Sequence, residues 1–437
     1  TIQCWPGSLL SFWMDLTKRP CPRQVADMEI EGKLNVLVLS GWVDQAFTFV
    51  RSFSGRPDLN MFVADCWPNS PCGYSKHCRE FRLIPKPEDP DHIDGLLDFC
   101  SEKEIDVLLP VQHDEVIEVA KHKEQFDQAG IRVPVPPYPL VELAMDKHRM
   151  AKLAKEHAIL TPETHLASEI DLADVERKIG FPLLTKLRSS TGQRGQKRVH
   201  DLVELQSHLQ TLLSEYPEDE IILQEHIPGS VQDTMYTAGL IYNHNHELRA
   251  CVPLKKIRSR PFTGGTAICT RAEDRHDVRE MAIGIMDCLG SWEGIADVEI
   301  KVDPRDGQPK FIELNPRPWG SMYGALVAGV DLPGLWVKVA MREDFDPIDS
   351  FEEGIYASFL TRDLLLLKEI VAKLFSRSWR QVWPVLCTFA WPYLSKGKRS
   401  SAFATSDFVL DDLEPFRKNI HRVGQNLLPK VLRQQSD

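Results

Sequence analysis

Two short segments with strict period-two alternation constrain this chain more than any other feature. In residues 296–302 every second residue is apolar, and the charged residues between them, Glu299 included, face the other way. After the turn sequence DPRDG, residues 311–315 alternate again, with Glu313 and Asn315 on one face. If the two segments pair as an antiparallel hairpin, the side-chain oxygens of Glu299, Glu313 and Asn315 converge on one face of a sheet.

These oxygen donors predict a site for a hard cation and an anionic ligand. Carboxylate and amide oxygens with open positions suit Mg²⁺, which takes water and phosphate oxygens as its further ligands. The segment NPRPWG (315–320) follows directly, and Arg317 in this proline-fixed turn is suited to gripping phosphate or carboxylate. The alternative is the solvated face of a two-stranded ribbon, and the adjacent arginine favours the anion site over it.

The first third of the chain has the pattern of an α/β domain. Apolar strands are expected at 35–39, 61–64 and 106–110, with helical patterns between them, one of them at 92–103. Such alternation predicts a parallel sheet with right-handed crossovers. The turn after the first strand reads SGWVD and lacks the G-x-G-x-x-G pattern, which argues against a dinucleotide site. His113 follows the 106–110 strand, where open α/β sheets place ligands, and a capped helix start explains it equally well.

Charge and composition exclude several classes of function. The 437 residues carry a net charge of −11, which argues against nucleic acid as a partner because a duplex repels an acidic surface. No window reaches the ~18 apolar residues of a membrane-spanning helix, and residues 1–16 lack the basic start and cleavage site of a signal peptide. Ten cysteines without paired spacing are ordinary intracellular usage. We therefore expect a cytoplasmic protein without a transmembrane segment.

From residue 35 to 336 the motifs resemble those of the ATP-grasp superfamily, carboxylate–amine or amino-acid ligases related to carbamoyl-phosphate synthase. The segments ELNPRPWGS and AGVDLP are similar to the family's metal and phosphate strand and to its usual sequel. The resemblance implies that Glu299, Glu313 and Asn315 hold Mg²⁺, with Mn²⁺ as an alternative ion. By the same resemblance, Arg317 would hold phosphate and the reacting carboxylate.

The resemblance also implies an ATP site further upstream. Lys147 would contact ATP phosphates from a helix start, and Lys186, closing the apolar run FPLLTK, would reach the α-phosphate and the adenine edge. A helix-surface lysine and a snorkelling lysine are the alternatives. The resemblance implies three further contacts. A small-residue loop with Ser190, Thr191, Gly192 and Gly195 would cover the β- and γ-phosphates, and a strand with Gln224, Glu225 and Ile227 would read the adenine. Asp233 would be the acidic ligand of the ribose. A plain flexible loop and a turn-capping aspartate are the alternatives for the first and last of these.

A basic segment, KKIR, stands out in an acidic chain. The resemblance makes it a phosphate-clamping strand, with Lys256 and Arg258 as catalytic residues beside Arg317. A triphosphate would explain the clustered positive charge. The alternative is an edge strand protected from pairing by its lysines.

We expect an α/β and α+β ATP-grasp fold with a parallel-sheet N-terminal domain, a small lid subdomain and a larger antiparallel-sheet subdomain. The expected divisions are a leader of unassigned role at 1–32, a pre-ATP-grasp domain at 33–140, an ATP-grasp domain at 141–345 with its lid at about 150–225, and a basic C-terminal extension at 346–437.

The activity implied by the resemblance is ATP-dependent joining of a small-molecule carboxylate to an amine. An acyl phosphate would form, and the amine would displace phosphate to give an amide, with release of ADP and phosphate. One alternative is a bicarbonate-using enzyme of the carbamoyl-phosphate or carboxylase type, disfavoured because no biotin carrier or glutaminase segment is present. The other is a non-catalytic nucleotide-binding regulatory module, disfavoured because all three metal positions are occupied by suitable residues.

The end of the chain differs in charge from the rest. Residues 366–437 hold 12 basic and 6 acidic residues, and the apolar stretch VWPVLCTFAWPYL (382–394) is flanked by basic residues. We expect an amphipathic helix packed on the ligase or a homodimer interface. Peripheral membrane contact through this extension is the alternative, because basic flanks and paired tryptophans suit a membrane surface.

Overall fold

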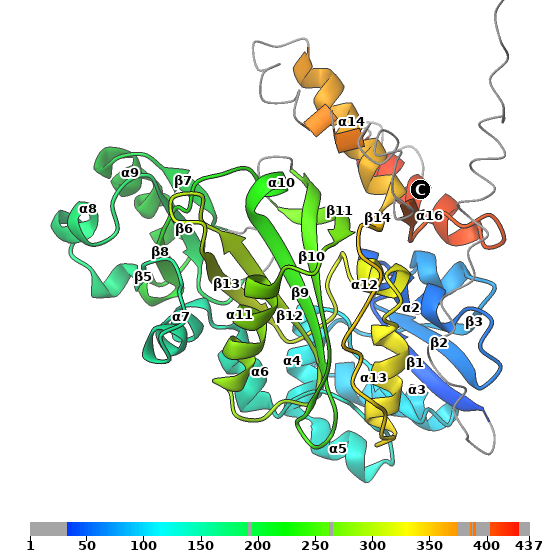
Figure 1. The fold of residues 1–437 in the computed structure, drawn as a ribbon. Helices are drawn as coiled ribbons and strands as arrows, with labels where there is room; N and C mark the ends of the chain where they lie inside the picture. The colour runs from blue at the N-terminus through cyan, green and yellow to red at the C-terminus, as the bar shows by residue number, and fades with distance from the viewer. Residues whose placement is uncertain are drawn as a thin grey trace, which may run out of the picture.

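The computed structural model describes residues 33–190, 195–261, 265–374, 385–386, 388–389 and 403–427. The leader expected at 1–32, the loop residues Thr191 and Gly192, and most of the apolar stretch at 382–394 lie outside the described residues. The described residues form three β-sheets with helices packed around them (Figure 1).

The N-terminal part is a parallel sheet, as expected. Among the described strands its order is β3-β2-β1-β4, and each neighbouring pair is parallel. The strands are β1 (Leu34–Leu39), β2 (Leu59–Asp65), β3 (Cys78–Leu83) and β4 (Val107–Leu109). The helices and the 3₁₀ turn of this part are α2 (Asp44–Phe53), η1 (Pro71–Tyr74), α3 (His92–Glu102), α4 (His113–Lys121) and α5 (Lys123–Gln128). The near-continuous apolar sequence of β1 reflects its burial on both faces of the sheet.

A small antiparallel sheet, here called the lid sheet, follows in the chain. Its order is β5-β8-β6-β7, from β5 (Thr164–Leu166), β6 (Leu183–Leu187), β7 (Lys197–Val199) and β8 (Ile221–Glu225). The helices before and within it are α6 (Tyr138–Met145), α7 (Lys147–Glu156), η2 (Ala167–Glu169), η3 (Leu172–Asp174), α8 (Val175–Lys178), α9 (Leu202–Leu213) and η4 (Glu218–Glu220). The Asp146 carboxylate accepts hydrogen bonds from the first backbone amides of α7, which fixes Lys147 at the start of that helix.

The largest sheet has the order β13-β12-β9-β10-β11-β14-β15 among the described residues. Its strands are β9 (Met235–Tyr242), β10 (Leu248–Arg260), β11 (Thr266–Ala272), β12 (Gly294–Val302), β13 (Pro309–Asn315), β14 (Tyr356–Ser358) and β15 (Phe403–Thr405). The remaining described helices are α10 (Val231–Thr234), α11 (His276–Asp287), α12 (Tyr323–Val327), α13 (Leu332–Ala340), α14 (Leu360–Leu374) and α16 (Glu414–Leu427). Neighbouring strands are antiparallel except β14 and β15, which are parallel.

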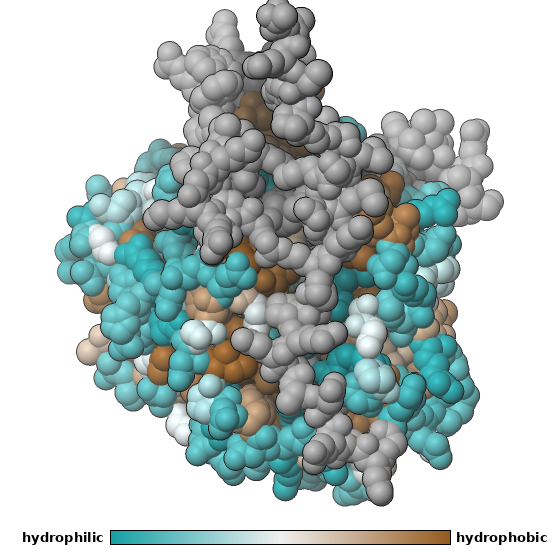
Figure 2. Space-filling model, turned by 45° about the vertical axis from the view of Figure 1, so that its right-hand side comes forward, coloured by the Kyte–Doolittle hydropathy of each residue, from teal (hydrophilic) through white to brown (hydrophobic). Residues whose placement is uncertain are grey.

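One continuous core joins the N-terminal sheet to the large sheet. Phe49 of α2 packs against Trp336 of α13, and the Trp336 indole N–H donates to the Pro134 carbonyl at 2.6 Å. A second core lies under α11 and contains Val298 and Ile300, the apolar face of β12. On the face drawn in Figure 2, hydrophilic residues dominate the rim, and hydrophobic residues gather beside the segments drawn in grey.

The two alternating segments pair as an antiparallel hairpin, as predicted. The register of β12 and β13 sets Glu299 opposite Glu313. In the turn between the strands, the Gly307 amide donates to the Asp303 carbonyl at 2.7 Å, and Gly307 has a φ of 74°, a value that favours glycine. The two carboxylates are therefore fixed on one face by the pairing itself.

Part of the C-terminal extension is built into the molecule. β14 and β15 extend the large sheet, and α16 packs against η1 of the N-terminal part, near the top of Figure 1. The buried Arg51 of α2 pairs with the buried Asp412, which also accepts hydrogen bonds from Ser75 Oγ and the Lys76 amide. Within the described part of the chain, no helix is long and apolar enough to cross a membrane.

Candidate functional site

A cavity of about 1060 Å³ lies where the N-terminal sheet, the lid sheet and the large sheet meet. It collects side chains from segments far apart in the sequence. Eleven of the predicted site residues line it: Lys147, Lys186, Ser190, Gln224, Glu225, Ile227, Lys256, Glu299, Glu313, Asn315 and Arg317. The structure thus brings together most of the residues that the sequence singled out.

The predicted metal ligands occupy one wall of this cavity. Glu299 and Glu313 face each other across the hairpin, and Asn315 lies opposite Asp297. In the described chain, no three His, Cys, Asp or Glu side chains form a ready metal cage. Two carboxylates and an amide oxygen fit Mg²⁺ that brings phosphate oxygens and water as its remaining ligands.

Cationic side chains pair with this acidic wall. Lys256 Nζ donates to Glu299 Oε1 at 2.7 Å, and Lys147 Nζ lies 3.5 Å from Glu313 Oε2. Burial opposes the charge on Lys256, but Glu299 and its acidic neighbours hold the Lys256 pKa above its ordinary value. Burial likewise opposes the charge on Glu313, and Lys147, Lys186 and the other nearby cations hold the Glu313 pKa below its ordinary value. Lys256 and Glu313 therefore stay ionised, and an incoming polyanion meets a Lys256 that is already charged.

Lys186 has a different environment. Its Nζ donates to Gln224 Oε1 at 2.7 Å, and Gln224 Nε2 donates in turn to Thr164 Oγ1 at 3.0 Å. Burial lowers the pKa of Lys186 to about 8, although Glu313 partly offsets this effect. A buried ammonium held mainly by a neutral amide is poised to gain an anionic partner.

Comparison with known proteins gives both sequence relatives and a fold. Residues 41–134 match the family model described as PylC-like, N-terminal domain. The formate-dependent phosphoribosylglycinamide formyltransferase of Prochlorococcus marinus is 27% identical over 223 residues, which cover 49% of this chain and 53% of that protein. The D-aspartate ligase of Enterococcus faecium is 23% identical over 284 residues, which cover 60% of this chain and 66% of that protein. The chain thus spans about half of the first relative and 66% of the second.

The N5-carboxyaminoimidazole synthetase from Staphylococcus aureus, solved in complex with ADP, superimposes with a TM-score of 0.60. The two chains are 16% identical, and the match covers 79% of this chain and 87% of the synthetase. This chain has the ATP-grasp fold. The expected fold class is confirmed, and the cavity lies between the lid sheet and the large sheet of the ATP-grasp architecture.

Three residues predicted for the ATP-grasp site do not line the cavity. The guanidinium of Arg258 is buried and donates two hydrogen bonds of 2.7 Å to the Asp363 carboxylate, so its predicted catalytic role finds no support in its position. Asp233 is exposed, and its carboxylate accepts a hydrogen bond from Ser230 Oγ in the first turn of α10. Gly195 has a φ of 68°, and a Cβ there would lie 2.9 Å from the Leu187 side chain, which explains the glycine by conformation and packing.

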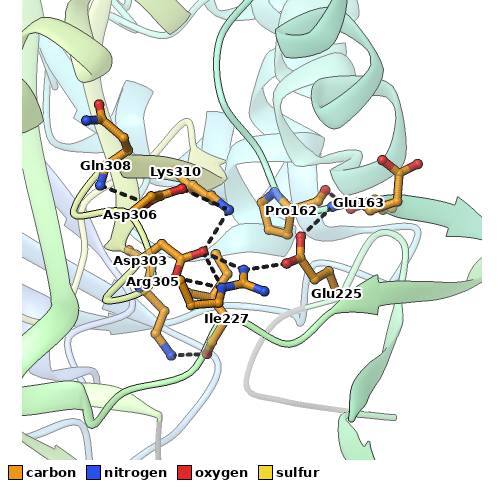
Figure 3. Close-up of polar contacts among 11 residues, drawn as sticks. Pro162, Glu163, Glu225, Ile227, Asp303, Arg305, Asp306, Gln308 and Lys310 are labelled. Carbon is orange, nitrogen blue, oxygen red and sulfur yellow. Dashed lines mark hydrogen bonds and ion pairs between the residues drawn. The ribbon is translucent and has the colours of Figure 1, made fainter. Parts of the chain in front are cut away.

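Glu225 and Ile227 line the cavity, but their polar groups have other partners. Figure 3 shows the Glu225 carboxylate turned toward Arg305 of the hairpin turn, and the Glu163 amide also donates to it at 3.3 Å. Lys301 Nζ donates to the Ile227 carbonyl at 2.8 Å. The predicted side-chain contact of Glu225 with a base would therefore require that its ion pair with Arg305 break, whereas its backbone remains on the cavity wall.

Asp297 is an acidic cavity residue that the sequence analysis did not select. It is 1% exposed and accepts hydrogen bonds from Thr237 Oγ1 and, at 3.2 Å, from Asn315 Nδ2. Burial, reinforced by the charge of Glu299, raises the Asp297 pKa to about 7. The signal for this residue was present, because the alternation that places Glu299 on the metal face places Asp297 there as well.

The cavity has further lining residues from the N-terminal sheet and the C-terminal extension, and of these the sequence analysis singled out only His113. Trp42, Asp44 and His113 line the cavity from the carboxyl ends of β1 and β4, and Arg362 lines it from α14. The first three follow the rule that open parallel sheets bind ligands at their carboxyl edge. Arg362 had no comparable signal, because it comes from the C-terminal extension.

Proposed function

We propose that this protein is an ATP-dependent carboxylate–amine ligase that forms an amide through an acyl phosphate and releases ADP and phosphate. The observation that carries the proposal is the convergence, around one cavity, of two facing glutamates and an asparagine with three lysines and an arginine. Oxygen ligands for the metal together with cations for the phosphates are what a magnesium-bound triphosphate requires.

The proposed roles follow from the positions of the side chains. Glu299, Glu313 and Asn315 would hold Mg²⁺, which supplies charge neutralisation at the phosphates. Lys186 would replace its Gln224 contact with a phosphate oxygen. Arg317, whose Nη2 donates to Asn315 Oδ1 at 3.0 Å, would hold the carboxylate next to the transferring phosphoryl group.

Phosphoryl transfer requires little covalent help from a protein, so catalysis in this site would consist of positioning and charge stabilisation. The substrate carboxylate attacks the terminal phosphorus of ATP, and ADP leaves. The amine then attacks the acyl carbon, and phosphate leaves with the bonding electrons. The lid sheet would exclude water, which would otherwise hydrolyse the acyl phosphate.

Among the named relatives, the D-aspartate ligase supports an amide-forming reaction. The D-aspartate ligase covers more of this chain than the formyltransferase does, and the synthetase with a similar fold was solved with ADP. The proposal extends these likenesses to this chain. The residues that line the cavity away from the predicted metal face would select the carboxylate and the amine.

Phosphate release tests the proposal. The full chain is mixed with ATP and Mg²⁺ and a panel of small carboxylates and amines, singly and in pairs. We expect release only with a pair, and its loss in Glu313→Gln, which keeps the shape of the side chain but removes its charge. Glu280→Gln on the exposed face of α11, with a side chain 63% exposed, is the matched control and should behave as wild type. Phosphate release that persists in Glu313→Gln would contradict the proposal.

A further inference from the structure

An ion pair joins two distant parts of the chain on the cavity wall. Arg362 Nε donates to Asp44 Oδ2 at 2.8 Å, and Arg362 Nη2 donates to Asp44 Oδ1 at 3.0 Å. Both residues line the cavity, at the end formed by the N-terminal sheet and the C-terminal extension. This pair belongs neither to the predicted metal face nor to the predicted phosphate-binding lysines, so the proposed function gives it no role.

Asp44 is well placed to keep its charge without Arg362. It is the first residue of α2, directly after the carboxyl end of β1, and the amino end of a helix stabilises a carboxylate. Arg362 lies in the first turn of α14, where the helix dipole disfavours a cation. The backbone amides at the start of α14 are capped by Asp407 instead, at 2.8 and 2.9 Å. Asp44 is therefore the hydrogen-bonded anion of Arg362, and the charge of the nearby Asp407 acts on Arg362 as well.

This pair is not what fastens the extension to the N-terminal part. That contact is made by Arg51 and Asp412, whose side chains are 7% and 2% exposed and lie outside the cavity lining. The side chains of Arg362 and Asp44 are 26% and 10% exposed and face the cavity.

We propose that Asp44 and Arg362 form the recognition site for a zwitterionic substrate, with the substrate ammonium bound by Asp44 and its non-reacting carboxylate bound by Arg362. The ligand ammonium then takes the place of Arg362 beside Asp44, and the ligand carboxylate takes the place of Asp44 beside Arg362. The local charge is then conserved, and no ion is left unpaired. A guanidinium also matches the planar geometry of a carboxylate.

The zwitterion inference rests on the proposed ligase function, because it names the class of one of the two molecules that are joined. It also gives the C-terminal extension a part in substrate choice. A second cation lies near this pair. The Arg422 guanidinium of α16 is 5.2 Å from the ring centroid of Trp42, which also lines the cavity. This second positive charge favours an anionic group at the Arg362 end.

Equilibrium binding by calorimetry, without nucleotide, tests the inference separately from catalysis. The probes are glycine, alanine, aspartate and lysine, each with its Nα-acetyl derivative and its α-carboxamide, which lack the α-ammonium and the α-carboxylate respectively. We expect at least one free amino acid to bind the full-length protein. Its two derivatives should bind at least tenfold more weakly, and Arg362→Gln should weaken binding of the amino acid at least tenfold.

A charge reversal separates recognition from a structural role. Asp44→Arg combined with Arg362→Asp restores an ion pair but reverses its polarity toward the ligand, so binding should stay at least tenfold weaker than in wild type. The control is Lys76→Gln, which breaks the exposed 3.0 Å pair with Asp411 between the same two parts of the molecule. It should leave binding unchanged.

Two results would overturn the inference: no amino acid of the panel binds, or the charge reversal restores wild-type affinity. Amino-acid binding that depends on Arg362, in a protein that releases no phosphate with any pair, would support the inference and contradict the ligase proposal. Phosphate release with pairs that contain no zwitterion would support the ligase and overturn the inference.

Discussion

Lys186 shows how a single residue can cost stability and serve binding. Its pKa falls from the ordinary 10.5 to about 8 because it is buried, with Gln224 as its hydrogen-bond partner. Between these two pH values the unfolded chain binds more protons than the folded one, so the free energy of unfolding increases as the pH increases. Below pH 8 the folded protein carries a charged lysine at a cost.

Replacing this lysine should therefore separate stability from nucleotide binding. Lys186→Met should raise the melting temperature at pH 7, because no charge is then buried, and should weaken ATP binding at least tenfold. In wild type, ATP affinity should decline as the pH increases through about 8, where Lys186 loses its proton.

Calorimetric titration of ATP from pH 6.5 to 9.5 measures this decline. Burial also lowers the pKa of Lys301 to about 8. The same titration of Lys301→Met therefore shows which of the two lysines causes the decline. Affinity that declines equally with pH in Lys186→Met and in wild type would contradict the assignment to Lys186.

At the residue scale, the sequence predicted those side chains whose faces follow from strand alternation. Glu299, Glu313 and Asn315 lie on the metal face because a period of two needs only a hairpin to align them. The prediction for Arg258 rested on the resemblance and on the clustered charge of KKIR, and a bulge in β10 between Lys256 and Arg258 breaks the alternation that would place both on one face. The partner of Arg258, Asp363, is 105 residues away, and no local pattern could have revealed it.

At the element scale, the hairpin turn links the large sheet to the lid sheet. Arg305 Nε donates to Asp303 Oδ1 at 2.9 Å, and its Nη2 reaches Glu225 at the end of β8 (Figure 3). Lys310 Nζ also donates to Asp303, at 2.7 Å. The β12–β13 hairpin and β8 are thus connected by one network, so movement of the lid sheet would strain or release this turn.

Gly239 of β9 determines how closely the Arg317 segment approaches the sheet. A Cβ at this position would lie 2.2 Å from the Trp319 ring, two residues beyond Arg317. Gly239→Ala should reduce the free energy of unfolding by about 1–3 kcal/mol, as overpacking does, and should lower phosphate release by displacing Arg317.

Urea unfolding and the phosphate assay measure the two effects of Gly239→Ala. The matched control is Gly424→Ala in α16, where the new Cβ meets nothing within 4 Å. That change should stabilise the protein by about 0.5–1 kcal/mol, because alanine is the better helix former. Wild-type stability and activity in Gly239→Ala would show that Trp319 can move without consequence.

The long elements were predictable, and the short C-terminal strands were not. The helices expected at 92–103 and 147–157 appear as α3 and α7, within one residue at each end. β14 and β15 have three residues each, too few for an alternation signal. β14 pairs antiparallel with β11, and β15 is added by a parallel pairing with β14 that local sequence does not encode.

At the scale of the whole molecule, the described part of the C-terminal extension is integrated with the parts that precede it. Its strands complete the large sheet, and its carboxylates reach the N-terminal helix α2 and the turn around Ser75. The expected division at 345 remains a prediction, as do the dimer and membrane alternatives for the extension. A variant ending at that division would lose two strands and Asp412 together.

Asp412 should therefore be essential for stability although it lies far from the metal face. Asp412→Ala leaves Arg51 buried and unpaired, and we expect a loss of about 3–5 kcal/mol in the free energy of unfolding, as for other broken buried pairs. The neighbouring Asp411→Ala removes only the exposed pair with Lys76 and should cost about 0–1 kcal/mol. Chemical denaturation of the two variants measures the contrast, and equal losses would contradict a stabilising role specific to Asp412.

The long-range pairing of α2 with the extension also sets the order in which a newly made chain matures. Arg51 and Asp412 are 361 residues apart, and at the usual ~5–20 residues per second of synthesis Arg51 waits on the order of 20–70 seconds for its partner. The metal face and the buried lysines are complete by residue 317, whereas Arg362 and the strand that secures it leave the ribosome later. A nascent chain would thus complete the residues of the proposed nucleotide site first, and those of the proposed zwitterion site only as translation of the extension finishes.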